Sequence, residues 1–508
     1  MSTHGLLLSP RLSARLGGQR REPFRRIAFP SIGEQGFLAG RERSLSSFGL
    51  SEHYVVDTVT KDTGTVPEAV EQFVSVADTV RPSGEARGKP HVVIVGGGFA
   101  GLNAAKGLAD APVRVTLIDR RNHHLFAPLL YQVATAQLSP ANIAQPIRSI
   151  LRGQDNTTVI LDEVTGVDSE GKTVSLASGS ILNYDFLIVA VGATHSYFGR
   201  DEWAPLAPGL KTLEDAINIR SRILMAFEEA ETEQDPKRRE ALLTFIVIGG
   251  GPTGVELAGA IGEIAKYTLA HDFKHIDTKG TKILLLGGLP RILPMFPEEL
   301  SAAAEADLGK FDVKVRTGSL VTAIDEGGVN IGDERIDAAT VIWAAGVQVS
   351  PLTKALGEIA ELDRAGRVAV ERELHIPGHP DIFVLGDAAG IKTAEGKPVP
   401  GVAPAAMQQG KWAASNIIRA VNGEAYAPFV YNDRGSLATI GRNQAVASVK
   451  GRNFNGFFAW IMWMLVHVFY LNGLRNRAMV ISQWAFGYFR FGRNARLITG
   501  VMPRRLKS

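Results

Sequence analysis

The 508-residue chain carries 55 Lys and Arg residues against 52 Asp and Glu, so its formal net charge at pH 7 is only +3. Its length allows two to four domains, because a domain usually has about 100–200 residues. It contains no cysteine, which excludes disulfides, thiolate metal sites and thiol-based redox relays, so any redox reaction has to use a bound cofactor.

The charge is divided unevenly along the chain. Residues 434–508 contain twelve basic residues and no Asp or Glu, whereas the residues before them contain 43 basic and 52 acidic ones. The cationic tail therefore needs an explanation of its own.

Residues 1–88 do not have the pattern of a packed domain. The first 50 residues hold eight Arg and no Lys, are poor in acidic residues and lack the apolar core of a secretory signal, a composition similar to that of a transit peptide. We interpret this segment as a disordered extension or as the result of an upstream start codon, with organelle targeting as the alternative, and expect at most one helix, near residues 66–80.

Residues 91–119 predict a strand, a glycine-rich turn, a helix and a second strand. Gly96 permits the tight turn, Gly98 lets the backbone approach a pyrophosphate, and Gly101 lets the helix pack closely on the strand. The helix N-terminus offers N–H groups and a positive dipole end to phosphates. Asp119, 18 residues after Gly101, stands where a carboxylate binds a ribose, so the whole unit predicts a dinucleotide site.

Two adjacent histidines, His123 and His124, follow this unit. Neighbouring side chains on an extended chain point apart and no third ligand stands nearby, so we expect structural roles rather than metal binding. Phe126, Pro128 and Tyr131 are expected to pack beside the ring system of the bound nucleotide. Further on, residues 158–184 predict a meander of short strands, and residues 185–193 predict a buried strand that ends at a glycine.

The strand, turn and helix pattern recurs 153 residues later, with Gly249, Gly251 and Gly254 in the turn. Such a repeat is typical of duplicated nucleotide-binding domains. Glu256 lies at the start of the second helix, where a buried carboxylate needs a partner or a ligand, and we favour a role facing the cofactor. The next strand ends in Gly287 instead of an acid, so the preference between NADH and NADPH is weakly specified.

A later apolar strand, residues 381–385, ends at Gly386 and Asp387. The glycine allows close approach, and the carboxylate can accept hydrogen bonds from a polyol. In the helix that follows, Gln408 or Gln409 can donate a hydrogen bond to a carbonyl group, although the same helix could serve packing alone.

Residues 454–474 form an uncharged apolar run, and a second apolar stretch covers residues 478–489. The purely apolar centre of the run is shorter than the roughly 20 residues that a spanning helix needs. Aromatic residues beside a wholly cationic surface favour a chain that lies in the plane of an anionic membrane. A spanning helix, a buried core helix and a nucleic-acid site are the alternatives, but the last leaves the uncharged run unexplained.

The chain resembles the type II NADH:quinone oxidoreductases over about residues 90–500. The resemblance rests on the motifs VIVGGGFAGL, NHHLFAPLLYQVATAQLSP, VIGGGPTGVELAGAIGE, VLGDAA, AAMQQG, GSLATIGRNQAVA and LNGLRNR. It implies an α/β fold with two Rossmann-like dinucleotide-binding domains and a C-terminal amphipathic membrane-attachment region. The FAD-binding domain would comprise residues 89–210 and 325–420, the NADH-binding domain residues 211–324, and the attachment region residues 421–508.

The same resemblance assigns roles to individual residues. FAD would be held by Gly96, Gly98, Gly101, Asp119 and Asp387, and NADH by Gly249, Gly251, Gly254 and Glu256. Gln408 matches a quinone-site glutamine, but Pro404 stands where many family members have a second glutamine, which puts the details of quinone contact in doubt. We expect Glu256 and Gln408 to be catalytic, with Glu256 either an acid/base group or a group that orients the nicotinamide, and we expect no metal.

The implied reaction passes a hydride from NADH to N5 of non-covalently bound FAD and then two electrons to a membrane quinone such as ubiquinone, without proton pumping. A soluble NAD(P)H-dependent flavin reductase of a small acceptor or redox protein, and a nucleotide-sensing membrane protein without fast turnover, are the alternatives. Disulfide reductases and sulfide:quinone reductases need cysteines that this chain lacks.

For location and partners, the expectation is peripheral attachment to the cytoplasmic face of a bacterial cytoplasmic membrane, with the mitochondrial inner membrane as the alternative. The C-terminal region would contact anionic lipid. We expect no nucleic acid as a partner, and a homodimer is compatible with the sequence.

Overall fold

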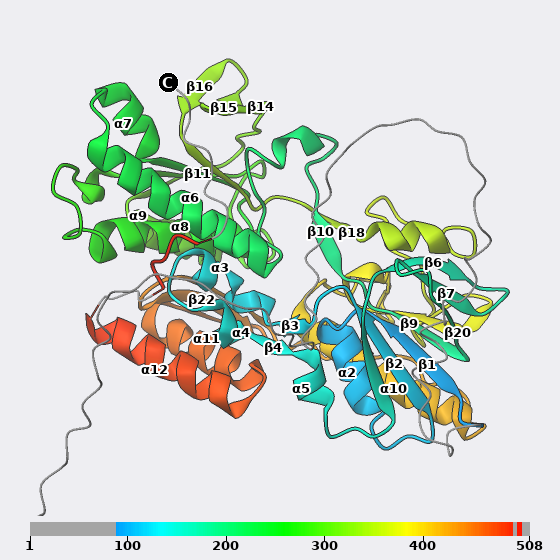
Figure 1. The fold of residues 1–508 in the computed structure, drawn as a ribbon. Helices are drawn as coiled ribbons and strands as arrows, with labels where there is room; N and C mark the ends of the chain where they lie inside the picture. The colour runs from blue at the N-terminus through cyan, green and yellow to red at the C-terminus, as the bar shows by residue number, and fades with distance from the viewer. Residues whose placement is uncertain (1–87, 491–494, 500–508) are drawn as a thin grey trace, which may run out of the picture. The chain divides into compact units, whose positions relative to one another are not determined.

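The computed structural model describes residues 88–490 and 495–499. The expectations for residues 1–87, including a helix near residues 66–80, lie outside the described residues. Strands and helices alternate from residue 91 onward, which confirms the α/β class (Figure 1).

The first sheet has six strands in the order β19-β20-β9-β1-β2-β5, parallel except for β19 at the edge. Parallel strands bring their carboxyl ends to one edge, where a ligand can meet several of them at once. The strands are β1 (His91–Val95), β2 (Arg114–Asp119), β5 (Thr157–Leu161), β9 (Phe186–Val189), β19 (His375–Ile376) and β20 (His379–Val384).

Strand β1 is buried along its whole length, because both faces of this sheet are covered. Val92 and Ile94 pack with α2 (Phe99–Gly107) and α10 (Ala403–Val421), whereas Val93 and Val95 pack with the meander on the opposite face. This explains the unbroken apolar run in the sequence. The meander is β6 (Val164–Asp168), β7 (Thr173–Leu176) and β8 (Ile181–Asn183); the strand expected at its start is β5, which instead pairs with β2 in the main sheet.

Short elements connect β2 to β5 and carry residues that matter below. They are β3 (His123–Leu125), α3 (Leu130–Ala134), α4 (Pro140–Ile143), β4 (Ala144–Pro146) and α5 (Ile147–Leu151), with β3 paired to β4.

The second sheet is parallel, in the order β13-β12-β11-β17. Phe245 and Val247 face the helical side, whereas Ile246 and Ile248 face a small antiparallel sheet, so β11 is buried like β1. The strands are β11 (Thr244–Ile248), β12 (Lys282–Leu286), β13 (Val313–Arg316) and β17 (Thr340–Trp343); the helices are α6 (Leu213–Thr232), α7 (Pro236–Leu242), α8 (Pro252–Glu263) and α9 (Glu298–Gly309); the small sheet is β14 (Ala323–Asp325), β15 (Gly328–Ile331) and β16 (Glu334–Asp337).

The chain crosses between the two sheets twice, and the crossings pair with each other. β10 (Ala193–His195) leaves the first sheet and β18 (Val347–Val349) returns to it, forming an antiparallel ribbon. We expected the return at residue 325, but β17 pairs with β11, so residues up to Trp343 belong to the second sheet. The second sheet is therefore an insertion into the first.

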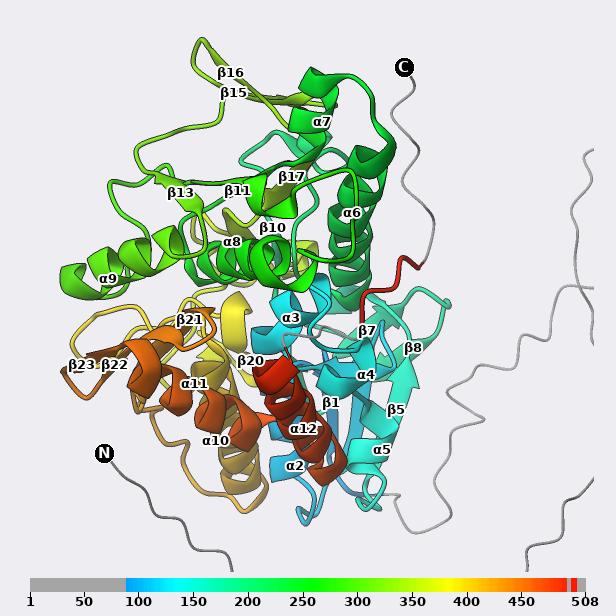
Figure 2. The same cartoon turned by 90° about the vertical axis from the view of Figure 1, so that its left-hand side faces the viewer.

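The C-terminal region begins with an antiparallel sheet that the sequence did not indicate. Its strands are followed by two helices that lie side by side in both views (Figures 1 and 2). In the described part of the chain, every helix is too short or too polar to reach across a bilayer. The elements are β21 (Ser436–Gly441), β22 (Gln444–Val449), β23 (Arg452–Asn455), α11 (Gly456–Tyr470) and α12 (Leu474–Arg490).

Candidate functional site

The first glycine-rich turn has the geometry that its sequence predicts. Gly96 has a φ of +102°, and a Cβ there would lie 2.4 Å from the carbonyl oxygen of Ala190. A Cβ on Gly101 would lie 1.8 Å from the carbonyl oxygen of Gly96, so helix and turn can pack only without a side chain. A Cβ on Gly98 would meet nothing within 4 Å.

Helix α2 begins in this open space, and its N-cap, Gly98, offers no side chain to its N–H groups. An uncapped helix N-terminus behind an open glycine is a fitting cradle for a pyrophosphate. The residues present therefore suit the dinucleotide that the sequence predicts.

Carboxylates flank this cradle. Asp119 lies at the end of β2; its Oδ2 accepts a hydrogen bond from the N–H of Gly97 (2.6 Å) and its Oδ1 accepts one from the N–H of Arg121 (2.7 Å). Asp387 follows β20 at the same edge of the sheet and is half-buried. Gly386 fits between the first turns of α2 and α10, so Asp387 is fixed close to α2.

The second turn repeats this construction. Gly249 has a φ of +125°, and its Cβ would lie 2.5 Å from the backbone of Ala344. A Cβ on Gly254 would lie 1.8 Å from the carbonyl oxygen of Gly249, whereas one on Gly251, the uncapped N-cap of α8, would meet nothing within 4 Å. The chain thus contains two glycine-rich turns with the same geometry.

His124 supports the first turn. Its Nδ1 lies 3.0 Å from the carbonyl oxygen of Gly97, and burial lowers the pKa of the imidazole to about 4, so the neutral ring donates this hydrogen bond. The rings of Phe99 and Phe126 follow in edge-to-face contact. Within residues 88–490 and 495–499, no cluster of three or more His, Asp or Glu side chains could hold a metal ion.

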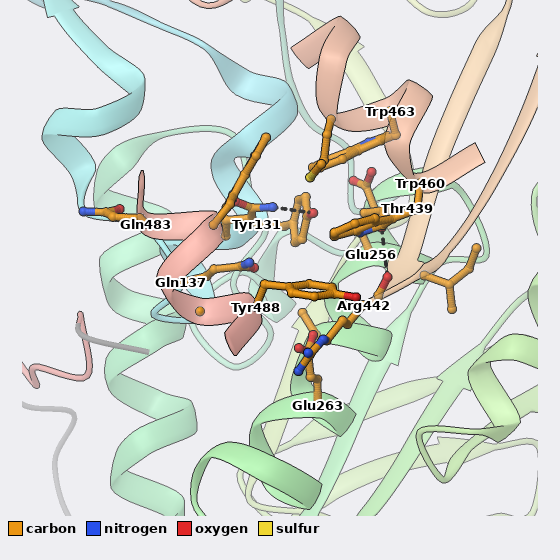
Figure 3. Close-up of a pocket in the computed structure, with 17 residues that line it drawn as sticks. Tyr131, Gln137, Glu256, Glu263, Thr439, Arg442, Trp460, Trp463, Gln483 and Tyr488 are labelled. Carbon is orange, nitrogen blue, oxygen red and sulfur yellow. Dashed lines mark hydrogen bonds between the residues drawn. The ribbon is translucent and has the colours of Figure 1, made fainter. Parts of the chain in front are cut away.

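A pocket of about 740 Å³, counting its open mouth, lies where α3, α8, β21, α11 and α12 meet (Figure 3). Glu256 from α8 and Tyr131 from α3 line it, and Trp460 and Trp463 of α11 form aromatic walls. Tyr131, expected beside the nucleotide ring system, thus lines this pocket. Arg442 also lines it and places its guanidinium 4.1 Å from the ring centroid of Tyr488, so one wall is cationic.

Glu256, which the sequence analysis expected to face the cofactor, lines this pocket. Burial raises the pKa of its carboxyl group well above the ordinary 4.5, and a hydrogen bond from the backbone N–H of Thr439 opposes only part of this shift. A carboxyl group with a raised pKa can give a proton when it is neutral and take one when it is ionised, which is the property of a general acid/base.

A buried chain of hydrogen bonds in the wall of the pocket links α12 to α3. The indole Nε1–H of Trp484 donates to Oε1 of Gln132 (2.8 Å), which fixes the orientation of the amide. Nε2 of Gln132 then donates to the hydroxyl oxygen of Tyr131 (2.9 Å), so the hydroxyl hydrogen of Tyr131 is directed away from Gln132. The sequence analysis had singled out neither Gln132 nor this link.

Gln408 is not brought to Glu256. Its Nε2 donates to the carbonyl oxygen of Asn432 (3.1 Å) and its Oε1 accepts from the N–H of Asn432 (3.0 Å). Its neighbour Gln409 is buried and accepts a hydrogen bond from the N–H of Gly386 (2.6 Å). Of the two glutamines, Gln409 therefore lies nearer the turn that carries Asp387, and Gln408 does not line the pocket.

Helix α8 can hold Glu256 in place only because Gly259 has no side chain. A Cβ there would lie 1.7 Å from the carbonyl oxygen of Ile440 in β21, next to Thr439. We expect Gly259→Ala to lower the free energy of unfolding by about 1–3 kcal/mol, as overpacking does. Chemical denaturation would measure it, with Gly280→Ala as the control, because a Cβ on Gly280 would meet nothing within 4 Å. Equal losses in both variants would contradict the close contact.

The family models and the relatives that match this chain agree with one another. Residues 90–410 match the pyridine nucleotide-disulphide oxidoreductase family, and residues 434–494 match the NDH2 C-terminal domain. Type II NADH:quinone oxidoreductase Ndh of Mycobacterium tuberculosis is 44% identical over 431 residues, which are 82% of this chain and 92% of that protein. The NdhA protein of the same organism is 45% identical over 430 residues, 82% and 90% of the two chains.

Among solved structures, NDH2 from Plasmodium falciparum in complex with NADH is similar with a TM-score of 0.73 at 21% identity, over 81% of this chain and 100% of that one. This likeness supports the two-domain α/β fold described above.

Proposed function

Because the chain belongs to the type II NADH:quinone oxidoreductase family, we propose that it oxidises NADH and reduces a membrane quinone by way of bound FAD. The observation that supports this most is the pocket in which Glu256 of the second nucleotide-binding unit meets the aromatic residues of α11 and α12. A residue of the second nucleotide-binding unit and an aromatic wall that suits a quinone therefore line the same pocket.

The two glycine-rich cradles divide the cofactors between them. We assign FAD to the first, with Gly96, Gly98 and Gly101 at the pyrophosphate and the carboxylates of Asp119 and Asp387 accepting hydrogen bonds from ribose and ribityl hydroxyls. We assign NADH to the second, with Gly249, Gly251 and Gly254 in the same parts. When bound, FAD supplies the redox chemistry, which the side chains of a cysteine-free protein do not offer.

The pocket has the side chains that reduction of a quinone needs. Reduction of a quinone by NADH takes up one proton beyond the hydride, and Glu256 can hold that proton on its carboxyl group until a quinone oxygen receives it. Trp460 and Trp463 can stack on a planar ring, and the hydroxyl group of Tyr131 can contact a quinone carbonyl. Contact of Gln408 with quinone remains a prediction, since it requires this side chain to leave Asn432.

Large apolar side chains on α11 and α12 support attachment to the membrane. They are well exposed to solvent, between 52% and 82%, and stand in the wholly cationic part of the chain. A helix pair of this kind lies in the headgroup region of an anionic bilayer. We call these residues the α11–α12 apolar face: Phe457, Phe458, Leu465, Phe469, Leu474, Ile481 and Phe489.

The cytoplasmic side of the membrane and a homodimeric assembly are further parts of the proposal. Both rest on the sequence alone.

The purified protein tests the proposed function directly. We expect a yellow preparation with a flavin absorption spectrum that is bleached by NADH and restored by a short-chain quinone. NADH oxidation should be faster with quinone than with a soluble dye or oxygen, and anionic vesicles should raise turnover of a long-chain quinone. A colourless protein would contradict the proposal. A yellow protein without turnover would favour a sensor, and one that reduces only the dye would favour a soluble reductase.

A further inference from the structure

The two nucleotide-binding units can be compared residue by residue, because the same hydrogen bond anchors each turn. The N–H of Gly96 donates to the carbonyl oxygen of Ile118 (2.8 Å), and the N–H of Gly249 donates to that of Leu286 (2.7 Å). Asp119 follows Ile118 and Gly287 follows Leu286. Gly287 therefore occupies the position that Asp119 occupies in the first unit, at the ribose end of the site.

Nothing in the backbone requires a glycine at residue 287. Its φ lies outside the left-handed region, and a Cβ there would meet only Gly250, at an ordinary 3.9 Å. In the first unit the corresponding carboxylate of Asp119 reaches the N–H of Gly97. A carboxylate would thus fit at residue 287, and its absence leaves the ribose end without the charge that repels a 2′-phosphate.

The loop after Gly287 adds positive charge instead. Residues 287–297 contain one charged residue, Arg291. Its guanidinium group is fixed by hydrogen bonds to the carbonyl oxygens of Phe296 (2.7 Å) and Pro294 (3.0 Å) and to Oγ of Ser301 (2.7 Å). The loop folds back on the glycine turn, since the N–H of Leu293 donates to the carbonyl oxygen of Gly250 (2.7 Å).

The neighbouring strand, β13, adds no net negative charge. Arg316, at the end of β13, forms two hydrogen bonds of 2.7 Å with the carboxylate of Glu334, so this pair is neutral overall. The loop that follows β12 therefore carries a fixed guanidinium group, and neither β12 nor residues 287–297 contain a carboxylate.

We propose that this protein uses NADPH as well as NADH, with the 2′-phosphate placed over Gly287. The inference rests on the proposed function, in which the second unit binds the pyridine nucleotide. The reaction keeps its balance, because NADPH gives the same hydride, one proton is taken up, and NADP⁺ and quinol are formed. The 2′-phosphate lies at the opposite end of the nucleotide from the nicotinamide and takes no part in the chemistry.

The test compares both nucleotides on the holoenzyme. We measure kcat/KM for NADH and NADPH with a short-chain quinone and, by calorimetry, the Kd of NAD⁺ and NADP⁺. In the wild type, the two kcat/KM values should agree within about tenfold, because no carboxylate discriminates between the ribose forms. A preference for NADH above this range would overturn the proposal.

Two variants separate charge from size. In Gly287→Asp, kcat/KM for NADPH and the affinity for NADP⁺ should fall by roughly a hundredfold relative to the NADH values, because like charges are brought together. In Gly287→Asn, of matched size, NADPH should be retained; equal losses in both variants would overturn the role of charge. If neither nucleotide binds, the proposed function fails, whereas NADH activity with rejection of NADPH removes only this inference.

Discussion

Replacing Glu256 with glutamine is expected to slow quinone reduction by about a hundredfold or more, the size of effect that a general acid/base usually contributes. The physical reason is that glutamine keeps the shape of the side chain and its hydrogen bond from Thr439 but cannot hold the proton that quinone takes up. Rapid-mixing spectroscopy separates the two halves of the reaction. Bleaching of the flavin by NADH should remain within about twofold of the wild type, and only its reoxidation by quinone should slow.

Glu263→Gln provides the control for this variant. Glu263 ends the same helix and lines the same pocket, so it offers a second carboxyl group for comparison. Its substitution should leave reoxidation by quinone nearly unchanged. Equal slowing by both variants would indicate a general effect of charge in the pocket, and unchanged turnover in Glu256→Gln would remove Glu256 from the mechanism.

Glu256→Gln should also change how the free energy of unfolding depends on pH. Because burial raises the pKa of Glu256, the folded protein holds a proton that the unfolded chain releases above the ordinary value of 4.5. Unfolding is therefore favoured progressively as the pH rises from that value to the raised pKa. Glutamine removes this pH dependence. The Tm of Glu256→Gln minus that of the wild type should therefore increase as the pH rises across this range. A constant difference in Tm would contradict the raised pKa.

The sequence was most informative where the structure is local. Gly96 needs a positive φ and Gly101 a close approach to Gly96, both of which are set within the turn, and the structure has them. The same holds for the outer bounds of this unit, because β1 begins at residue 91 and β2 ends at residue 119, as predicted. In these segments, turn chemistry and periodicity fix the conformation before the rest of the chain is considered.

The sequence could not predict what depends on distant partners. Trp484 and Gln132 are 352 residues apart, and only the packing of α12 against α3 makes them a hydrogen-bonded pair. Gln408 and Gln409 differ by about 100° around α10, so the face each occupies depends on how α10 packs on α2, which Gly410 allows. The sequence analysis assigned the short strands β21–β23 to the membrane-attachment region. It relied on the cationic composition of the whole tail rather than on the alternation of apolar and polar residues in these strands.

Replacing Phe458, Leu465 and Phe469 together with glutamate is expected to reduce binding to anionic vesicles by about a thousandfold or more. These residues are 60–67% exposed and lie seven and four residues apart on α11, so they point to one side of the helix. Each contributes about 1.5–3 kcal/mol when it enters an apolar environment, and each glutamate adds repulsion from anionic lipid. Sedimentation with vesicles of mixed neutral and anionic lipid would measure the loss.

The pocket itself should survive this change, because none of the three side chains lines it. Turnover of a soluble short-chain quinone should therefore stay within about twofold of the wild type, while turnover of a long-chain quinone held in vesicles falls with membrane binding. The matched control replaces Leu161, Ile181 and Leu320, which are 57–72% exposed on other parts of the surface. Release of both variants from vesicles to the same extent would contradict attachment through the α11–α12 apolar face.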